Sequence, residues 1–467
     1  MSVNPRRRVL TILAASATTF TGLAAAPTAQ AADVNDALAA FGITGNVQVV
    51  PIGHTGDVTA ELIAAAKSAA PANQPRIITL PAGSVQVKER IRMADNVYLV
   101  ADPATSVLLT ATADQLLWFN AVKGGVYGGN WDSSHRSDTV IGAKASTVRL
   151  AHLTVRNANE NGIVAYTKSS LTLADVASTG NNDDGIHSES STVTATRVRS
   201  TANRRNGLQL STGSVGTIVD STLDGNGLAV TGSTTNKTGH GLGLSSSRAT
   251  VTGTTMSSNK VCGVSLTSSA EVSLVRTTVS SNGRHGLGTV PGVKASMTDS
   301  VVANNGYNGV LASGSKTQVQ LTRVTISGTA ERGLSVPSNG TATIQGSTFT
   351  TSKGKNISVS AGGSLTVLSD NQVTAGSIEG ITVSDKANIT VNGTGNVVKS
   401  NGSTGLVISG KGTTGRINKA MRFETNGKYG ILVKAKGKLT TVTNTFVSNK
   451  STTMRSQSGG KITKIKP

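Results

Sequence analysis

The sequence contains few of the residues that commonly hold a compact protein together. Its only cysteine, Cys262, excludes an intramolecular disulfide, and we expect this thiol to be a small buried side chain rather than a reactive group. Aromatic residues make up 3% of the chain and charged residues 15%. After residue 31, no apolar run reaches the roughly 18 residues that a membrane-spanning helix needs. The sequence therefore predicts neither a disulfide scaffold nor a membrane span.

Basic residues outnumber acidic ones, with 44 Lys and Arg against 24 Asp and Glu and a formal net charge of +20. This excess predicts an anionic partner, such as an acidic polysaccharide or a cell-wall polymer. The scarcity of aromatic residues argues against a nucleic-acid groove, which needs stacking side chains. The excess is strongest after residue 415, where seven lysines form either an anion-binding strip or a solubilising end: Lys428, Lys434, Lys436, Lys438, Lys461, Lys464 and Lys466.

The first 31 residues have the three parts of a secretory signal peptide. Arg6, Arg7 and Arg8 are followed by a largely apolar stretch over residues 9–23 and by a small-residue cleavage site at residues 29–31. Three consecutive arginines fit either the general or the twin-arginine export route. We therefore expect a secreted, extracellular protein.

An internal repeat dominates the chain from residue 157 onward. Its unit places one or more polar residues, often asparagine, before a glycine that opens a short apolar strand. Ten of the eleven spacings lie between 22 and 25 residues, and one is 34. The repeat glycines, with Asn356 replacing one of them, are Gly162, Gly185, Gly207, Gly241, Gly263, Gly286, Gly309, Gly333, Gly380, Gly405 and Gly430. A period of this kind is typical of a solenoid.

Each repeat contains three short strands with alternating apolar residues, and no helix lies between them. Residues 263–266, 270–274 and 277–279 are one example. Stacked coils of this kind form three parallel sheets with coils about 4.8 Å apart. The prediction is an all-β, right-handed parallel β-helix. Asparagines that recur near one corner should hydrogen-bond from coil to coil: Asn157, Asn182, Asn203, Asn259, Asn282, Asn305, Asn401, Asn426 and Asn449.

The pattern resembles the right-handed β-helix superfamily of pectate lyases, polygalacturonases and uronan C5-epimerases. Residues 56–67 are similar to the short helix that caps the first coil, and residues 80–83 to the turn after the first strand. With the signal peptide over residues 1–31, we expect an N-terminal segment with a capping helix over residues 32–75 and a β-helix with basic C-terminal coils over residues 76–467. We expect a monomer.

Chemistry-bearing side chains recur at fixed positions around the repeat glycines. The residues one and two before the glycine share a corner, and the residue two after it points outward. These columns bring together, within about three coils or roughly 10 Å, the predicted catalytic residues. They are Asp183, Asp184, His187, Arg205 and His240. A base, an acid and a charge neutraliser in one place are suited to proton abstraction from a uronate.

The family resemblance also bears on the type of reaction. Asp183-Asp184-Gly185 and Gly239-His240-Gly241 resemble two elements of the polygalacturonases, but the coil between them supplies no carboxylate. Hydrolysis by two separated carboxyl groups is therefore disfavoured. The resemblance implies lyase or epimerase chemistry on an anionic, uronate-like polysaccharide, with Ca²⁺ as an optional cofactor. Residues expected to bind substrate are Arg204, Gln209, Arg284, His285 and Trp131.

Two alternatives stay open. The charged columns could be a solvated surface ladder, and the protein would then be a non-catalytic surface or wall-binding solenoid. The 34-residue spacing adds a segment near residues 225–238, which is either a groove wall beside His240 or a tolerated insertion.

Overall fold

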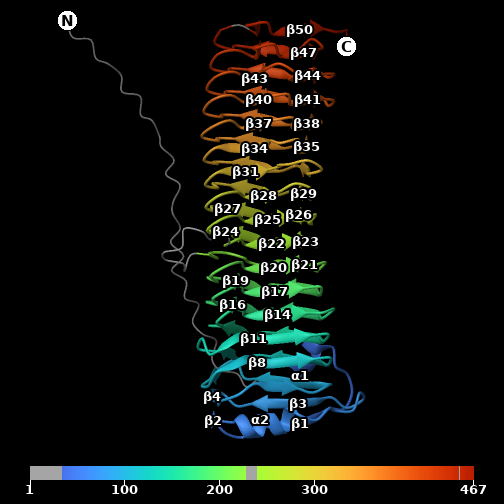
Figure 1. Ribbon diagram of the computed structural model, residues 1–467, viewed down its shortest axis with the longest axis vertical. Helices are drawn as coiled ribbons and strands as arrows, with labels where there is room; N and C mark the ends of the chain where they lie inside the picture. The colour runs from blue at the N-terminus through green and yellow to red at the C-terminus, as the bar shows by residue number, and fades with distance from the viewer. Residues whose placement is uncertain (1–33, 228–238, 452, 467) are drawn as a thin grey trace, which may run out of the picture.

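The chain folds into a long column of stacked coils that rises from the N-terminal to the C-terminal end (Figure 1). The computed structural model describes residues 34–227, 239–451 and 453–466. The predicted signal peptide lies outside these residues, as does most of the predicted segment at 225–238. The all-β, right-handed parallel β-helix predicted from the repeat is confirmed.

Three faces run along the column. An 18-stranded sheet extends from β1 (Gln48–Pro51) to β50 (Lys461–Lys464). A second face has a 7-stranded sheet, which includes β19 (Arg199–Thr201), followed by a 9-stranded sheet, which begins at β24 (Thr255–Ser257). Isolated bridges of Thr222 connect these two sheets.

The third face is a 16-stranded sheet, and its strands pair in parallel from coil to coil, as β17 with β20 and β20 with β22. Its strands are β5 (Ile91–Met93), β8 (Ala113–Asn120), β11 (Ser137–Lys144), β14 (Ile163–Tyr166), β17 (Ile186–Glu189), β20 (Leu208–Ser211), β22 (Leu242–Ser245), β25 (Val264–Thr267), β28 (Leu287–Thr289), β31 (Asn308–Leu311), β34 (Arg332–Val336), β37 (Ile357–Val359), β40 (Ile381–Ser384), β43 (Leu406–Ser409), β46 (Ile431–Lys434) and β49 (Met454–Ser456).

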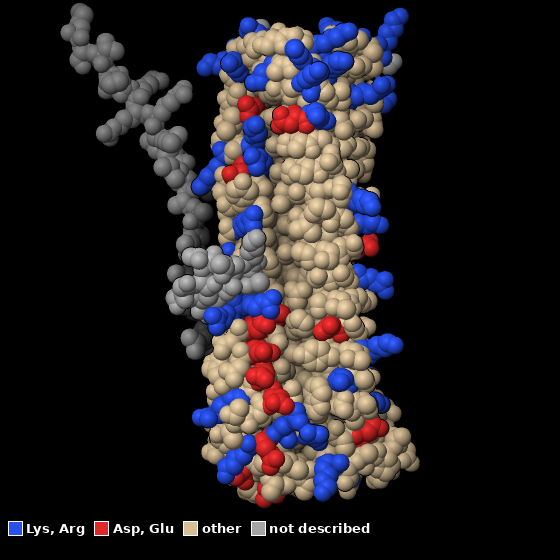
Figure 2. Space-filling view, viewed as in Figure 1, with Lys and Arg blue, Asp and Glu red and all other residues tan. Residues whose placement is uncertain are grey.

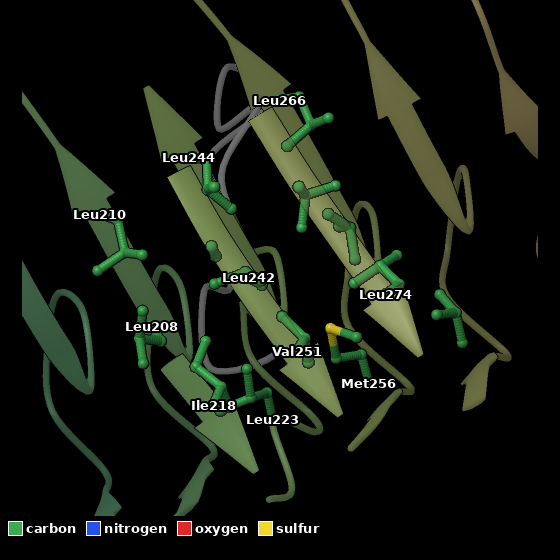
Figure 3. Close-up of a cluster of buried hydrophobic side chains, with 14 of the residues drawn as sticks. Leu208, Leu210, Ile218, Leu223, Leu242, Leu244, Val251, Met256, Leu266 and Leu274 are labelled. Atoms are coloured by element: carbon green, nitrogen blue, oxygen red, sulfur yellow. The ribbon is translucent and has the colours of Figure 1, made fainter. Parts of the chain in front are cut away.

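The core is a continuous stack of aliphatic side chains inside the coils. Alternate residues of each strand point inward, so Leu208 and Leu210 of β20 lie beside Leu242 and Leu244 of β22 (Figure 3). These four side chains are at most 1% exposed. Because every coil buries its apolar face only against its neighbours, the column can extend without large aromatic residues.

A ladder of buried asparagines runs along one corner. Asn203 Oδ1 accepts hydrogen bonds from the backbone and side-chain nitrogens of Asn181, and Asn203 Nδ2 donates to Asn226 Oδ1 at 3.1 Å. The ladder confirms the predicted coil-to-coil bonding, with two corrections. Asn181 takes the place predicted for Asn182, which is exposed, and Asn157 bonds to Asp132 instead. Asn226, one of the residues that the prediction omitted, is a full member.

Two short helices precede the column. The predicted capping helix is α2 (Thr59–Ala66), and its Leu62 and Ala66 are fully buried against the first coil. The helix α1 (Val34–Phe41) was not predicted, and it packs on the outside through Phe41 against Tyr98, with ring centroids 4.8 Å apart. Stacking begins at β1, which pairs with β3 (Arg76–Leu80), so the β-helix starts before the predicted boundary at residue 76.

Candidate functional site

The strand register places the outward column where the repeat predicted it. Val164 pairs with His187, His187 with Gln209, and Gln209 with Gly243. These residues lie side by side on the outward side of the 16-stranded sheet, where His187 and Gln209 are half-buried and Val164 is fully buried. Side chains about two dozen residues apart in sequence therefore become lateral neighbours.

A buried carboxylate orients the first histidine of this column. Asp184 is fully buried, and its Oδ2 lies 2.9 Å from His187 Nδ1, while its Oδ1 accepts the backbone N–H of Asn206 at 3.0 Å. Because both oxygens act as acceptors, His187 Nδ1 carries the proton that binds Asp184. His187 Nε2 is then a lone-pair nitrogen, and it lies 3.5 Å from Ser211 Oγ. The His187 side chain is 23% exposed, so this nitrogen can accept a proton from a group in the groove.

His240 has the opposite tautomer. Its Nδ1 accepts the backbone N–H of Cys262 at 3.2 Å, so a neutral ring carries its proton on Nε2. It belongs to a second corner ladder, in which Asn206 Oδ1 accepts the N–H of His240 at 3.0 Å. His240 therefore has a structural hydrogen bond as well as a protonated nitrogen that can donate.

Arg205 and Asp183 form an ion pair beside the histidines. Arg205 Nη1 lies 2.8 Å from Asp183 Oδ1, and the Arg205 side chain is 42% exposed. Burial raises the pKa of Asp183 to about 6, and the neighbouring Asp184 and Glu160 add to the rise, whereas Arg205 and His187 oppose it. The Asp183 carboxyl therefore gains or loses its proton at a pH close to neutral.

These groups share one groove on the outer surface of the sheet. A cavity of about 340 Å³ has both histidines, Arg205, Gln209 and Ser211 in its lining. Gln209 lies over Gly243, where a Cβ atom would be 2.1 Å from its Oε1. Of the predicted catalytic residues, His187, Arg205 and His240 line the groove. Asp183 and Asp184 are outside the lining, and they contact Arg205 and His187, respectively.

Two of the residues predicted to bind substrate are buried, so their prediction is wrong. Trp131 is fully buried, and its Nε1 donates to the Gly128 carbonyl at 2.9 Å, so it cannot stack on a sugar. His285 is 4% exposed, and burial, with the charge of Arg284, lowers its pKa to about 4. It is therefore a neutral corner residue. Its ring lies 5.3 Å from the ring of Tyr307, centroid to centroid, and this burial could not be recognised from the corner position alone.

The two predicted arginines lie outside the groove lining. Arg204 and Arg284 are exposed at the same corner, and neither is among the residues that enclose the cavity. Sequence reasoning also missed two residues that the groove contains, Ser211 and Asn206. Ser211 is four residues after Gly207, on the same outward side of β20 as Gln209, so the alternation within the strand could have identified it.

The described residues offer no obvious metal centre. Among them, no group of three or more His, Cys, Asp or Glu side chains is placed to hold a metal ion. Ca²⁺ as an optional cofactor stays a prediction. Neither α1 nor α2, nor any other helix within the described ranges, is long and apolar enough to cross a membrane.

The C-terminal coils carry the predicted basic surface. Figure 2 shows Lys and Arg side chains gathered at the end of the column that carries the last strands. Lys438 of β47 (Lys438–Thr441) pairs with Lys461 of β50, so like charges are lateral neighbours. The seven predicted lysines are all exposed: Lys428, Lys434, Lys436, Lys438, Lys461, Lys464 and Lys466.

Solved structures with a similar overall arrangement have little sequence in common with the chain. Pectate lyase Pel9A is 15% identical, with a TM-score of 0.42, and the match covers 54% of this chain and 74% of the lyase. The A-module of the Azotobacter vinelandii mannuronan C-5 epimerase AlgE4 is 14% identical, with a TM-score of 0.39, covering 91% and 98%. PfbA, a surface adhesin of Streptococcus pneumoniae, is 11% identical, with a TM-score of 0.38, covering 80% and 87%.

Comparison of the sequence with family models relates the chain to a known family. No match was found among curated proteins. The family described as the right handed beta helix region matches residues 138–292 and 262–420, which together make up more than half of the chain. The chain belongs to the right-handed β-helix family.

Proposed function

We propose that the protein is exported and acts on an anionic, uronate-like polysaccharide by elimination or epimerisation at C5. The observation that carries this proposal is the Asp184–His187 pair, at 2.9 Å, beside Arg205 in a single groove. Both reactions begin when a base removes the C5 proton next to a carboxylate, and both need a cation to neutralise that carboxylate. The groove contains each of these groups.

His187 is the proposed base. Its Nε2 accepts the C5 proton, and Asp184 stabilises the imidazolium that forms and holds the ring in its tautomer. The buried carboxylate can do this without being exposed to the substrate. Arg205, whose side chain is 42% exposed, offers its remaining N–H groups to the uronate carboxylate.

His240 is the proposed acid. The N–H on Nε2 of the neutral ring can donate to the departing glycosidic oxygen in an elimination, which breaks the C4–O bond and leaves an unsaturated sugar. In an epimerisation, a proton returns to C5 from the opposite side instead. The arrangement supports both outcomes, because each uses one nitrogen that accepts and one that donates.

A non-catalytic function in surface or wall binding is the second candidate. It is favoured by the structural bonds of His240 and Asn206 in the corner ladder and by the basic C-terminal coils. In that case the groove would bind an acidic polymer without converting it. The printed names of the similar structures include a lyase, an epimerase and an adhesin, and they do not choose between the two.

Incubation with a panel of acidic glycans in deuterium oxide separates these functions. Elimination gives ultraviolet absorbance from an unsaturated product, and epimerisation gives deuterium at C5 without new absorbance. We expect one of these signals on at least one uronan. Salt-dependent binding to the panel with neither signal would overturn the catalytic proposal in favour of the binding function.

Two histidine variants assign the signal to the groove. His187→Asn removes the base, and we expect the rate to fall by about 10² to 10⁴. His152→Asn is the matched control, because His152 also lies near an aspartate, with Nε2 3.7 Å from Asp175 Oδ2, but at another corner. The control should retain the full rate. An equal loss in both variants would contradict the assignment of His187.

A further inference from the structure

The 16-stranded sheet presents a second concave surface beside the proposed site. A cavity of about 590 Å³ opens over β8, β11, β14 and β17. Its size is within the usual range of ligand sites. The residues that line it are Trp118, Lys144, Tyr166, Thr167, Lys168, Glu189 and Ser190. We call this surface the Trp118 subsite.

Trp118 covers a glycine. It pairs with Gly142 on the next coil, and a Cβ atom at Gly142 would be 2.7 Å from two carbons of the indole ring. The missing side chain therefore lets the ring lie against the sheet. Unlike Trp131, which is fully buried, Trp118 remains half-exposed. An indole supported by backbone on one side and open on the other is an aromatic platform, whose electron-rich face attracts the C–H groups of a sugar ring.

The surroundings of this platform are polar, and they carry two lysines against one acid, Glu189. Lys144 pairs with Tyr166 across β11 and β14, and Lys168 lies just beyond β14. Within the described part of the chain, neither lysine has an ion-pair partner. Burial raises the pKa of Tyr166, with Glu160 and Glu189 adding to the rise, so its phenol stays neutral and can donate to a hydroxyl. A carboxylated sugar matches this combination of ring, cations and hydroxyl.

The platform is in line with the proposed base. The register runs from Trp118 to Gly142, Val164 and His187, one coil at a time. Three strand spacings place Trp118 about 14 Å from His187 along the column. Glu189, on the same strand as His187, borders the cavity. One polysaccharide chain can therefore pass over both.

We propose that the Trp118 subsite binds a sugar ring of a carboxylated polysaccharide, stacked on the indole with its acid group against Lys144 and Lys168. The inference rests on the proposed function only in that the same polymer would continue to His187. Binding at the platform needs no chemistry in the groove. It also predicts that short uronates, which cannot span both places, bind more weakly than long ones.

The chain is suited to a direct test, because it has two tryptophans and one of them is buried. Fluorescence titration of the whole protein with polygalacturonate and alginate oligosaccharides should report on Trp118. We expect saturable quenching by long carboxylated oligomers and none by dextran. Because Trp118→Ala removes the reporting ring, the affinities of the variants are measured by isothermal titration calorimetry, and we expect at least a tenfold loss in Trp118→Ala. Trp118→Phe should restore part of that affinity, since it retains an aromatic face.

The experiments distinguish a failure of the Trp118 subsite from a failure of the proposed C5 chemistry. If Trp118→Ala binds long oligomers as tightly as the native protein, the inference is wrong whatever the groove does. If quenching and the tenfold loss are seen but no C5 chemistry occurs, the subsite stands and the catalytic proposal falls. A Lys144→Gln, Lys168→Gln variant should make binding less salt-dependent, and unchanged salt dependence would refute the role of the lysines.

Discussion

Removing one rung of the asparagine ladder should weaken the column locally and strongly. Asn282 is 1% exposed, and its side chain makes four hydrogen bonds of 3.0–3.1 Å: Oδ1 accepts from the N and Nδ2 of Asn259, and Nδ2 donates to the Met256 carbonyl and Asn305 Oδ1. Asn282→Ala leaves the buried N–H of Asn259 without this acceptor. An orphaned buried group costs about 1–3 kcal/mol and each of the three other lost bonds about 0.5–1.5 kcal/mol, so we expect a loss of about 2.5–7.5 kcal/mol.

The assay must measure local stability. Each coil contacts only its neighbours, so a long solenoid does not unfold as one unit. Native-state hydrogen exchange, read by mass spectrometry over peptides that contain Asn259 and Asn282, gives the free energy of local opening. Asn182→Ala is the control, because Asn182 is exposed and has a single 3.5 Å contact with His135, and its cost should stay within about 0.5 kcal/mol. A loss below about 1 kcal/mol for Asn282→Ala would refute the reasoning.

Three further predictions follow from charge and burial. Asp183 should titrate near pH 6 in a ¹³C NMR experiment. Because its pKa is raised on folding, its contribution to stability is present in acid and lost as the pH rises through about 6, and a midpoint near 4 would contradict this. Burial raises the pKa of Cys262 from 9.0 to about 11, so iodoacetamide at pH 8 should alkylate the native thiol roughly a hundredfold more slowly than the unfolded one; equal rates would contradict the burial. Replacing Lys438 and Lys461 by glutamine should lower the salt dependence of polymer binding, and an unchanged slope would exclude this end as a binding surface.

Much of the fold could be predicted because every coil obeys the same local constraints. Most repeat glycines directly precede the strands of the 16-stranded sheet, as Gly185 precedes β17 and Gly207 precedes β20, whereas Gly309 and Gly333 lie inside β31 and β34. The corner ladder was harder to assign in detail. Asn181 and Asn182 are adjacent, and only burial selects the first. The helix α1 has eight residues, and its packing on Tyr98 depends on a tertiary contact that no local pattern reveals.

The sequence could predict which residues lie side by side at fixed offsets from the repeat glycines. It could not predict whether each of these side chains points into the groove or into the core. The outward column was correct because strand alternation fixes it, and this placed His187 and Gln209. The residue before each glycine instead turns into a corner, where Cys262 and His285 are buried. Trp118 was missed because it precedes the region with a clear repeat, although its partner Gly142 occupies the same outward column as His187.

The most direct test of the account is a crystal structure of the protein with a long uronate oligosaccharide. We predict a chain that lies along the outer surface of the 16-stranded sheet, with one ring on Trp118 and a carboxylate at Arg205 within reach of His187. An oligosaccharide bound only at the C-terminal lysines, with the groove empty at saturating ligand, would contradict the central claim that this groove is the functional site.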